Sequence, residues 1–217
     1  MSKKLIGITQ NIIKHPAHGD FLSCLDINWA SLIYMLDCVP IPISLATNEQ
    51  IDNTLHDLKL HGIILSGGNN ITALSENTDE LHATVSIRDE NERKILDYAH
   101  KNMTPVIGIC RGFQFLNHYF GGKLEKVSGH ANVNHALEVS RGHNFDFLPS
   151  SVNSFHNYCI PISGLASELI PIAFDQDGNV EAAYHPDHNM MGIMWHPERT
   201  IIDLDTDLRI FYQAFQL

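Results

Sequence analysis

The sequence has few basic residues and no long apolar run. Its 14 Lys and Arg stand against 25 Asp and Glu, which gives a net charge of −11. Such a chain repels a phosphate backbone on average, so we expect no nucleic-acid partner. No segment approaches the roughly eighteen apolar residues of a membrane span, and the apolar run at 5–9 is too short for a signal peptide. We therefore expect a cytoplasmic protein without a membrane partner.

Cysteine is also scarce, with Cys24, Cys38, Cys110 and Cys159 as the four copies. No two of them form a Cys-x-x-Cys pair, so they indicate neither a zinc site nor a secreted disulfide framework. Two His-x-x-His pairs, at 15–18 and 185–188, lie beside Pro or Gly and lack an obvious third ligand nearby. We expect no metal and no other cofactor.

The length and composition predict one domain, 1–217, of the α/β class. Strand patterns alternate with helix patterns up to about residue 120, which predicts a mainly parallel central sheet flanked by helices. Beyond residue 123, short apolar runs and an Asp177-Gly178 turn predict additional antiparallel strands. The expected strands are 5–9, 39–45 (an edge strand, because of its two prolines), 63–65, 105–109, 136–139, 170–174, 180–184 and 190–195, and the expected helices are 24–38, 47–60, 87–102, 111–120 and 203–216.

The most informative motif is Gly108-x-Cys110-x-Gly112, which joins a hydrophobic strand to a helix. This is the cysteine form of a nucleophile elbow, a sharp turn that presents its side chain at the carboxyl end of the sheet. The positive end of the helix dipole favours a thiolate at that position. A buried core cysteine next to a tight turn is the alternative if the motif is taken alone.

A base for this cysteine is available in His196, with Glu198 two residues later. In extended backbone these two side chains point the same way, so Glu198 can fix the His196 tautomer while the other ring nitrogen faces Cys110. A His-x-Glu pair alone is more often a strand-end histidine with a solvated acid, but the upstream elbow favours a Cys–His–Glu triad. The backbone amides of Gly68 and Arg111 are candidate donors to an oxyanion.

Three segments together resemble the class I glutamine amidotransferase superfamily: Ser66-Gly67-Gly68, the stretch 108–114 and Trp195-His196-Pro197-Glu198. Segments 86–92 and 152–156 are similar to its branch of free-standing γ-glutamyl hydrolases. The resemblance covers essentially the whole chain. It implies cleavage of a γ-glutamyl amide through a glutamyl thioester, with Cys110 as nucleophile, His196 as base and then acid, and Glu198 as the orienting group. It further implies that a small-molecule γ-glutamyl substrate contacts Gln114, the Ser154 and Phe155 backbone, and His156.

The stretch Asn69-Asn70-Ile71-Thr72 departs from the Asp-Val-x-Pro pattern of that branch. With Gly129-His130 and Asn134-His135, the chain looks more like bacterial hydrolases that act on γ-glutamyl-CDP-amidate in capsular phosphoramidate synthesis. This implies a pyrophosphate-bearing leaving group, for which the candidate donors are Asn69, Asn70, Arg88, His130 and His135. Arg88 is also one helical turn from Glu92, and we favour that structural pairing.

Other functions stay open on the sequence alone. They are a γ-glutamyl-γ-aminobutyrate-type hydrolase, a glutaminase subunit that supplies ammonia to a partner synthetase, and a non-catalytic α/β binding module. Activity of the purified chain without a partner separates the hydrolases from the glutaminase subunit. The sequence leaves homo-oligomerisation open.

Overall fold

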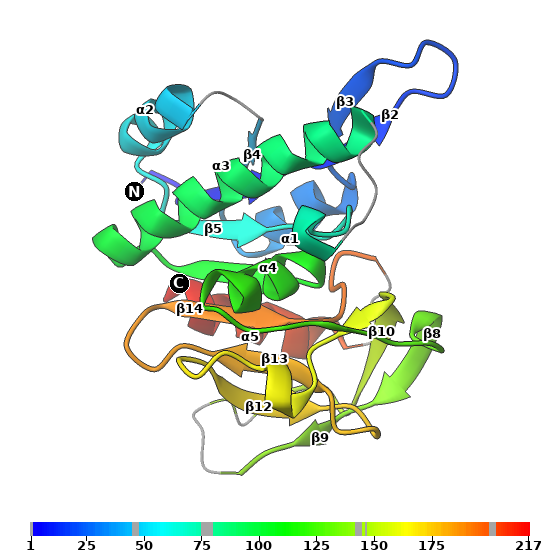
Figure 1. Cartoon of the computed structure of the whole chain (residues 1–217). Coiled ribbons are helices and arrows are strands. Elements are labelled where there is room, and N and C mark those ends of the chain that lie inside the picture. Colours follow the sequence, from blue (N-terminus) through cyan, green and yellow to red (C-terminus); the bar gives the residue numbers. More distant parts are fainter. Residues whose placement is uncertain (1, 45–47, 75–79, 142–144, 146, 200–202) are drawn as a thin grey trace.

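The computed structural model describes residues 2–44, 48–74, 80–141, 145, 147–199 and 203–217. An eight-stranded sheet forms its centre, in the order β4-β1-β5-β6-β14-β13-β12-β9 (Figure 1). The parallel strands are β4 (Val39–Ile43), β1 (Leu5–Thr9), β5 (Gly62–Leu65), β6 (Val106–Ile109) and β14 (Met190–Ile193), and the antiparallel ones are β13 (Val180–Tyr184), β12 (Ile170–Phe174) and β9 (Glu138–Val139). The predicted α/β class and mainly parallel sheet are confirmed.

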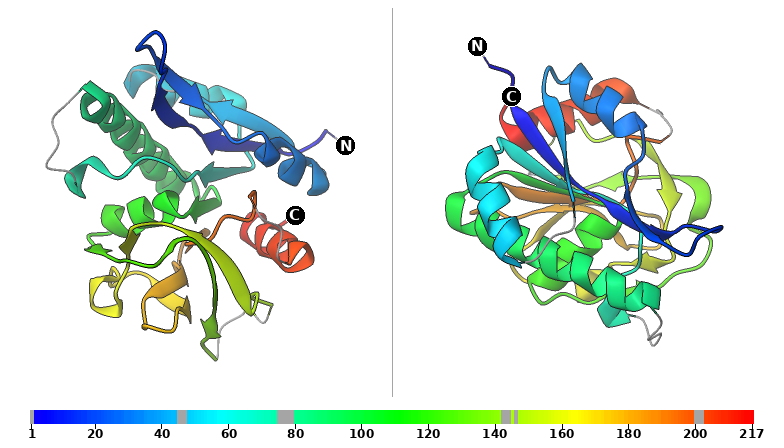
Figure 2. Two further views of the ribbon diagram at one scale, coloured as in Figure 1. Left: turned by 90° about the vertical axis from the view of Figure 1, so that its right-hand side faces the viewer. Right: turned by 90° about the horizontal axis from the view of Figure 1, so that it is seen from above.

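Helices cover both faces of this sheet (Figure 2). One face packs against α1 (Asn28–Met35) and α5 (Leu204–Phe215), and the other against α2 (Asn48–Leu58), α3 (Glu80–Asn102) and α4 (Arg111–Tyr119). Successive strand residues point to opposite faces, so Ile64 packs on the α1 side whereas Ile63 and Leu65 pack on the α3 side. Burial on both faces explains why the central strands are continuous apolar runs. No described helix is both long and apolar enough to cross a membrane.

Smaller pairs of strands lie outside the main sheet. Strands β2 (Asn11–Lys14) and β3 (Phe21–Cys24) form a hairpin, β8 (Ala131–Ala136) pairs with β10 (Ser151–Phe155), and β7 (Glu125–Lys126) pairs with β11 (Tyr158–Cys159). Single 3₁₀ turns occur at Thr72–Leu74 and Ile162–Gly164. The β2–β3 and β8–β10 pairs project on the same side of the molecule (Figure 1).

Most predicted elements are present, and the differences have local causes. The helix expected over 24–38 begins only at Asn28, because Cys24 is paired in β3. The strand expected over 136–139 is divided between β8 and β9, which belong to different sheets. The helix expected from 87 starts earlier, at Glu80, and the expected start of α2 at Thr47 lies outside the described residues. The edge position of β4 and the turn at Gly178 (φ 81°) are confirmed.

Candidate active site

Cys110 occupies the turn between β6 and α4, as the elbow motif predicts. Its backbone has φ 51° and ψ −106°, a conformation that costs a non-glycine residue about 1–3 kcal/mol. The turn is tight on both sides: a Cβ at Gly108 would lie 2.6 Å from the backbone of Gly112, and one at Gly112 would lie 2.0 Å from the carbonyl oxygen of Leu65. The Cys110 amide donates to Ile193 O at 2.8 Å, which ties the elbow to the end of β14.

His196 and Glu198 lie at that end of β14 and are buried. Nδ1 of His196 is 2.7 Å from Oε1 of Glu198, so the other ring nitrogen is left for Cys110. Burial alone would lower the pKa of His196, but hydrogen bonds and charge interactions with Cys110 and Glu198 outweigh it and raise the pKa to about 9. The site therefore favours the imidazolium form of His196.

The backbone that brings the pair together differs from the expectation. Residues Pro197 to Arg199 form a turn, closed by the Arg199 amide donating to His196 O at 3.2 Å, so the predicted extended conformation was wrong. Asn153 of β10 fixes the position of His196 instead. Its Oδ1 accepts from the His196 amide and its Nδ2 donates to the His196 carbonyl, both at 2.8 Å. The ring of Phe155 meets the imidazole edge-on, with centroids 5.7 Å apart.

The Gly67-Gly68 turn lies against the same imidazole, because a Cβ at Gly67 would be 2.6 Å from His196 Cε1. Arg88 holds this turn from behind, with Nη2 donating to Ser66 O at 2.8 Å and to Gly67 O at 3.1 Å. In a trans peptide the C=O and the following N–H point in opposite directions. The bond to Gly67 O therefore turns the Gly68 amide away from Arg88 and leaves it free to serve as an oxyanion donor.

Arg88 itself is fully buried, so it does not contact substrate. Its Nε donates to Glu92 Oε1 at 2.9 Å, which confirms the structural pairing and corrects its inclusion among the leaving-group donors. The side chain of Arg111 bonds Glu92 and Asp89 in the same cluster. Asp89 also accepts from the amide of Thr72 at 2.8 Å. This network connects α3, α4 and the chain after Gly68, and only the backbone of Arg111 is left for the oxyanion.

Of the other residues predicted to contact substrate, some are hydrogen-bonded within the protein and one is exposed to solvent. Gln114 Nε2 donates to Tyr158 O at 2.9 Å, and Ser154 Oγ donates to His130 O at 2.7 Å. The Asn69 side chain accepts from the Ile12 amide and donates to the Ile12 carbonyl, so it anchors β2. Asn70 is exposed.

Cys159 is buried in β11, and burial raises the pKa of its thiol to about 11. It is therefore a poor nucleophile compared with a thiolate at a helix start.

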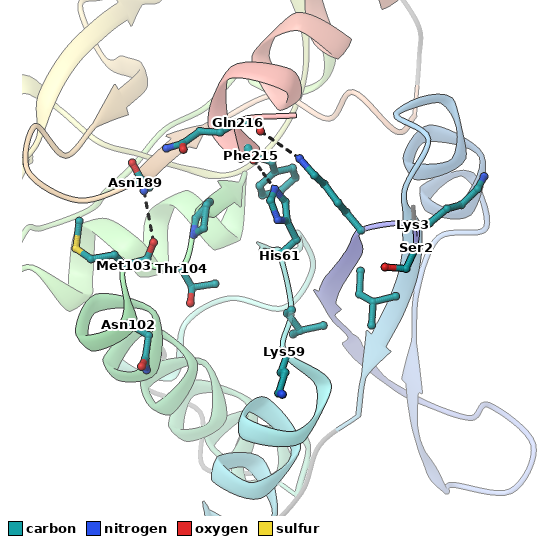
Figure 3. Close-up of a pocket in the computed structure, with 14 residues that line it drawn as sticks. Ser2, Lys3, Lys59, His61, Asn102, Met103, Thr104, Asn189, Phe215 and Gln216 are labelled. Atoms are coloured by element: carbon teal, nitrogen blue, oxygen red, sulfur yellow. Dashed lines mark hydrogen bonds between the residues drawn. The ribbon is translucent and has the colours of Figure 1, made fainter.

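A pocket of about 250 Å³ adjoins the triad. Its lining residues come from the β2–β3 hairpin, the segment that leads from β3 into α1, the Gly67-Gly68 turn and the chain after β14, and they include Asn11, Asp26, Trp29, Gly68, Glu198 and Arg199. Asn11 and Arg199 were not singled out by sequence, because neither belongs to a recognisable motif. A larger cavity, of about 650 Å³, lies at the opposite edge of the sheet, where β1, β5, β6 and β14 begin (Figure 3). Catalytic groups at the carboxyl ends of the strands are remote from it.

His130, His135 and His156 form a separate cluster around Glu181 of β13, in which His130, His156 and Glu181 are buried and His135 is partly exposed. Nε2 of His156 is 3.7 Å from Oε1 of Glu181, and Nε2 of His135 is 3.7 Å from Oε2. The rings of His130 and His156 have centroids 5.1 Å apart. His130 and His135, which the resemblance implies as leaving-group donors, thus lie with His156 around Glu181.

Comparison with known proteins places these features in a family. The family model of Peptidase C26, a group with the class I glutamine amidotransferase-like fold, matches residues 4–198. The chain belongs to the Peptidase C26 family. Its match to this family extends from before β1 to Glu198, so it includes Cys110, His196 and Glu198, the three positions of the candidate triad.

Proteins similar to this chain carry the names of different activities. The chain is 30% identical over 197 residues to the γ-glutamyl-CDP-amidate hydrolase of Campylobacter jejuni, covering 89% of this chain and 90% of the relative. It is 30% identical over 141 residues to one of the subunits of the glutamine-hydrolysing GMP synthase of Picrophilus torridus, covering 63% and 66%. The solved structure of a glutamine amidotransferase from Thermotoga maritima superposes with a TM-score of 0.67 at 12% identity, covering 100% and 84%. The solved structure shows the fold, and the family match together with the Campylobacter jejuni relative supports a hydrolase of the C26 type.

Proposed function

We propose that the chain hydrolyses the γ-glutamyl amide bond of γ-glutamyl-CDP-amidate, releasing L-glutamate and cytidine diphosphoramidate for capsular phosphoramidate synthesis. The observation that carries the proposal is the buried pairing of His196 with Glu198, at 2.7 Å, beside the strained Cys110 elbow. The similarity to the Campylobacter jejuni hydrolase over nearly the full length of both chains supports this choice of substrate.

In the proposed reaction, the Cys110 thiolate attacks the γ-carbonyl carbon. The amides of Gly68 and Arg111 donate to the resulting oxyanion. The protonated His196 gives its proton to the leaving nitrogen, the C–N bond breaks, and a glutamyl thioester remains on Cys110. His196, now neutral, takes a proton from water, which attacks the thioester and releases glutamate. The C–S bond breaks, the sulfur leaves as a thiolate, and the starting pair of Cys110 thiolate and protonated His196 is restored, with Glu198 orienting the imidazole throughout.

A second function, release of ammonia from glutamine for a partner synthetase, is supported by the similarity to the Picrophilus torridus GMP synthase. The same triad chemistry would serve it. The two functions differ in the leaving group and in the need for a partner protein.

The deciding experiment measures glutamate release by the purified chain from γ-glutamyl-CDP-amidate, γ-glutamyl-γ-aminobutyrate and L-glutamine. Cys110→Ala should abolish the activity, and Cys159→Ala, the matched control, should retain it. Fast release from γ-glutamyl-CDP-amidate alone supports the proposal. Release from glutamine alone favours the ammonia-supplying function, and full activity of Cys110→Ala contradicts the triad.

A further inference from the structure

The histidine cluster around Glu181 contains buried polar atoms that no described residue satisfies. Glu181 is 1% exposed, and neither carboxylate oxygen has a hydrogen-bond partner among the described residues. Nε2 of His135 and Nε2 of His156 also lack one. A buried carboxyl group is usually paired, bound to a metal ion or protonated. One bound cation would pair with all of these atoms at once.

The position of His135 is consistent with a cation at this place. Its Nδ1 lies 3.1 Å from the carbonyl oxygen of Ala136, and its Nε2 lies 3.7 Å from Glu181 Oε2, too far for a hydrogen bond. An imidazole nitrogen and a carboxylate oxygen that face the same space are both ligands that a transition-metal ion accepts.

The distances fit a small transition-metal ion. One ligand atom from each of His130, His156 and Glu181 lies within 4.8 Å of the other two. Zn²⁺ bonds of about 2.0–2.2 Å to nitrogen and oxygen place tetrahedral ligand atoms about 3.3–3.6 Å apart. The observed separation of 3.7 Å between His156 Nε2 and Glu181 Oε1 is close to that range. Imidazoles with one carboxylate select zinc-class ions over Mg²⁺ or Ca²⁺, which prefer oxygen ligands.

Outer groups around the cluster resemble those that orient metal ligands. Nε2 of His130 faces Asp175 Oδ2 at 3.6 Å, while Nδ1 of His130 has no hydrogen-bond partner among the described residues. Asp175 is itself held by the amides of Asp177 and Asn179, at 2.9 and 2.8 Å. A carboxylate behind a ligating histidine fixes its tautomer and raises its basicity.

We propose that His130, His156 and Glu181 bind one Zn²⁺-class ion, with His135 as the fourth donor. The ion connects the β8–β10 pair to β13 of the main sheet, because His130 directly precedes β8, His156 directly follows β10 and Glu181 lies in β13. Its role is structural: it holds β10, whose Asn153 fixes the His196 backbone, and it takes no part in the thioester chemistry. The inference does not depend on which amide the chain cleaves.

The test uses tag-free protein, because a polyhistidine tag binds the same ions. Metal content by mass spectrometry should give about one Zn²⁺ per chain after growth with zinc, and Glu181→Gln and His156→Ala should reduce it to background. The double variant His15→Ala/His18→Ala is the matched control. It removes two stacked histidines, of which His18 is exposed and His15 is partly buried, and should keep the ion.

Two measurements on the wild-type chain do not depend on whether the variants fold. After chelation and dialysis, Co²⁺ should bind with the intense visible absorption of a tetrahedral site, and sub-stoichiometric Zn²⁺ should displace it. Zn²⁺ should also raise the melting temperature of the chelated protein by mass action. The proposal is overturned if the wild type binds no stoichiometric ion, if Glu181→Gln and His156→Ala retain it, or if the Co²⁺ spectrum is octahedral. An unchanged melting temperature overturns the structural role.

Discussion

The substitution Arg88→Gln tests whether a buried guanidinium holds the Gly67-Gly68 turn in its catalytic orientation. Arg88 donates to Glu92, to Ser66 O and to Gly67 O, and no solvent reaches it. Glutamine is shorter and uncharged, so it cannot replace these three contacts together. The Gly67 peptide then becomes free to rotate, and the Gly68 amide loses its fixed direction.

The structure gives two separate magnitudes for this change. Removing one partner of a buried ion pair costs about 3–5 kcal/mol of stability. For a chain of this length each kcal/mol lowers the melting temperature by about 2–4 °C, so the loss amounts to about 6–20 °C. Misplacing one oxyanion donor lowers kcat by roughly 10²–10³-fold. KM should change little, because the oxyanion exists only in the transition state.

The assay is steady-state glutamate release, measured well below the melting temperature of the variant, with circular dichroism to verify folding. Arg93→Gln is the matched control, because Arg93 lies on the same helix but is exposed, with its guanidinium over the ring of Tyr119 at 5.8 Å from the centroid. It should keep kcat and lose less than about 1 kcal/mol. If folded Arg88→Gln keeps kcat within about twofold of wild type, the reasoning about the turn is refuted.

The other predictions concern the triad and the elbow. Glu198→Gln should lower kcat of glutamate release by roughly 10²–10⁴-fold with little change in KM, because the imidazole loses its charged partner. Because the pKa of His196 is raised to about 9, its contribution to stability is fully present below about pH 6.5 and is lost as the pH rises through about 9, which urea denaturation across that range should show. Cys110→Ala removes one of the two groups that raise the pKa of His196, so an NMR titration should give a lower pKa for this ring. An unchanged value would show that the thiol does not interact with the ring. Gly112→Ala places a Cβ 2.0 Å from a carbonyl oxygen of β5 and should lower the free energy of unfolding by about 3 kcal/mol. Gly121→Ala, where a Cβ meets nothing within 4 Å and φ is 86°, should cost only about 1 kcal/mol, and equal losses in urea denaturation would contradict the steric argument.

Local patterns were sufficient to predict the parallel half of the sheet and the elbow. A strand such as Val106–Ile109 is apolar because both its faces are buried, and the glycines beside Cys110 are required by close backbone contacts within a few residues. These constraints involve residues that are close together in the sequence, so local sequence patterns indicate them. The β2–β3 hairpin was missed for the opposite reason: most of its side chains are partly or fully exposed, so no alternation of apolar residues marks its strands.

The supports of the site could not be predicted from sequence, because they join distant segments. Asn153 and His196 are 43 positions apart, and Arg88 lies more than 20 residues from the turn that it holds. The pairing of His196 with Glu198 was predicted from an extended backbone, whereas a turn provides it. Long-range packing determines these contacts, and no local pattern encodes it.

The two hydrogen bonds between Asn153 and the His196 backbone make the position of the catalytic base depend on β10. Phe155 at the end of the same strand contacts the imidazole. A ligand that shifts β10 by a fraction of an ångström therefore shifts the base relative to Cys110, since a proton-transfer distance tolerates little error. Under the proposed function, a ligand that binds against β10 would therefore change kcat without contacting the glutamyl group.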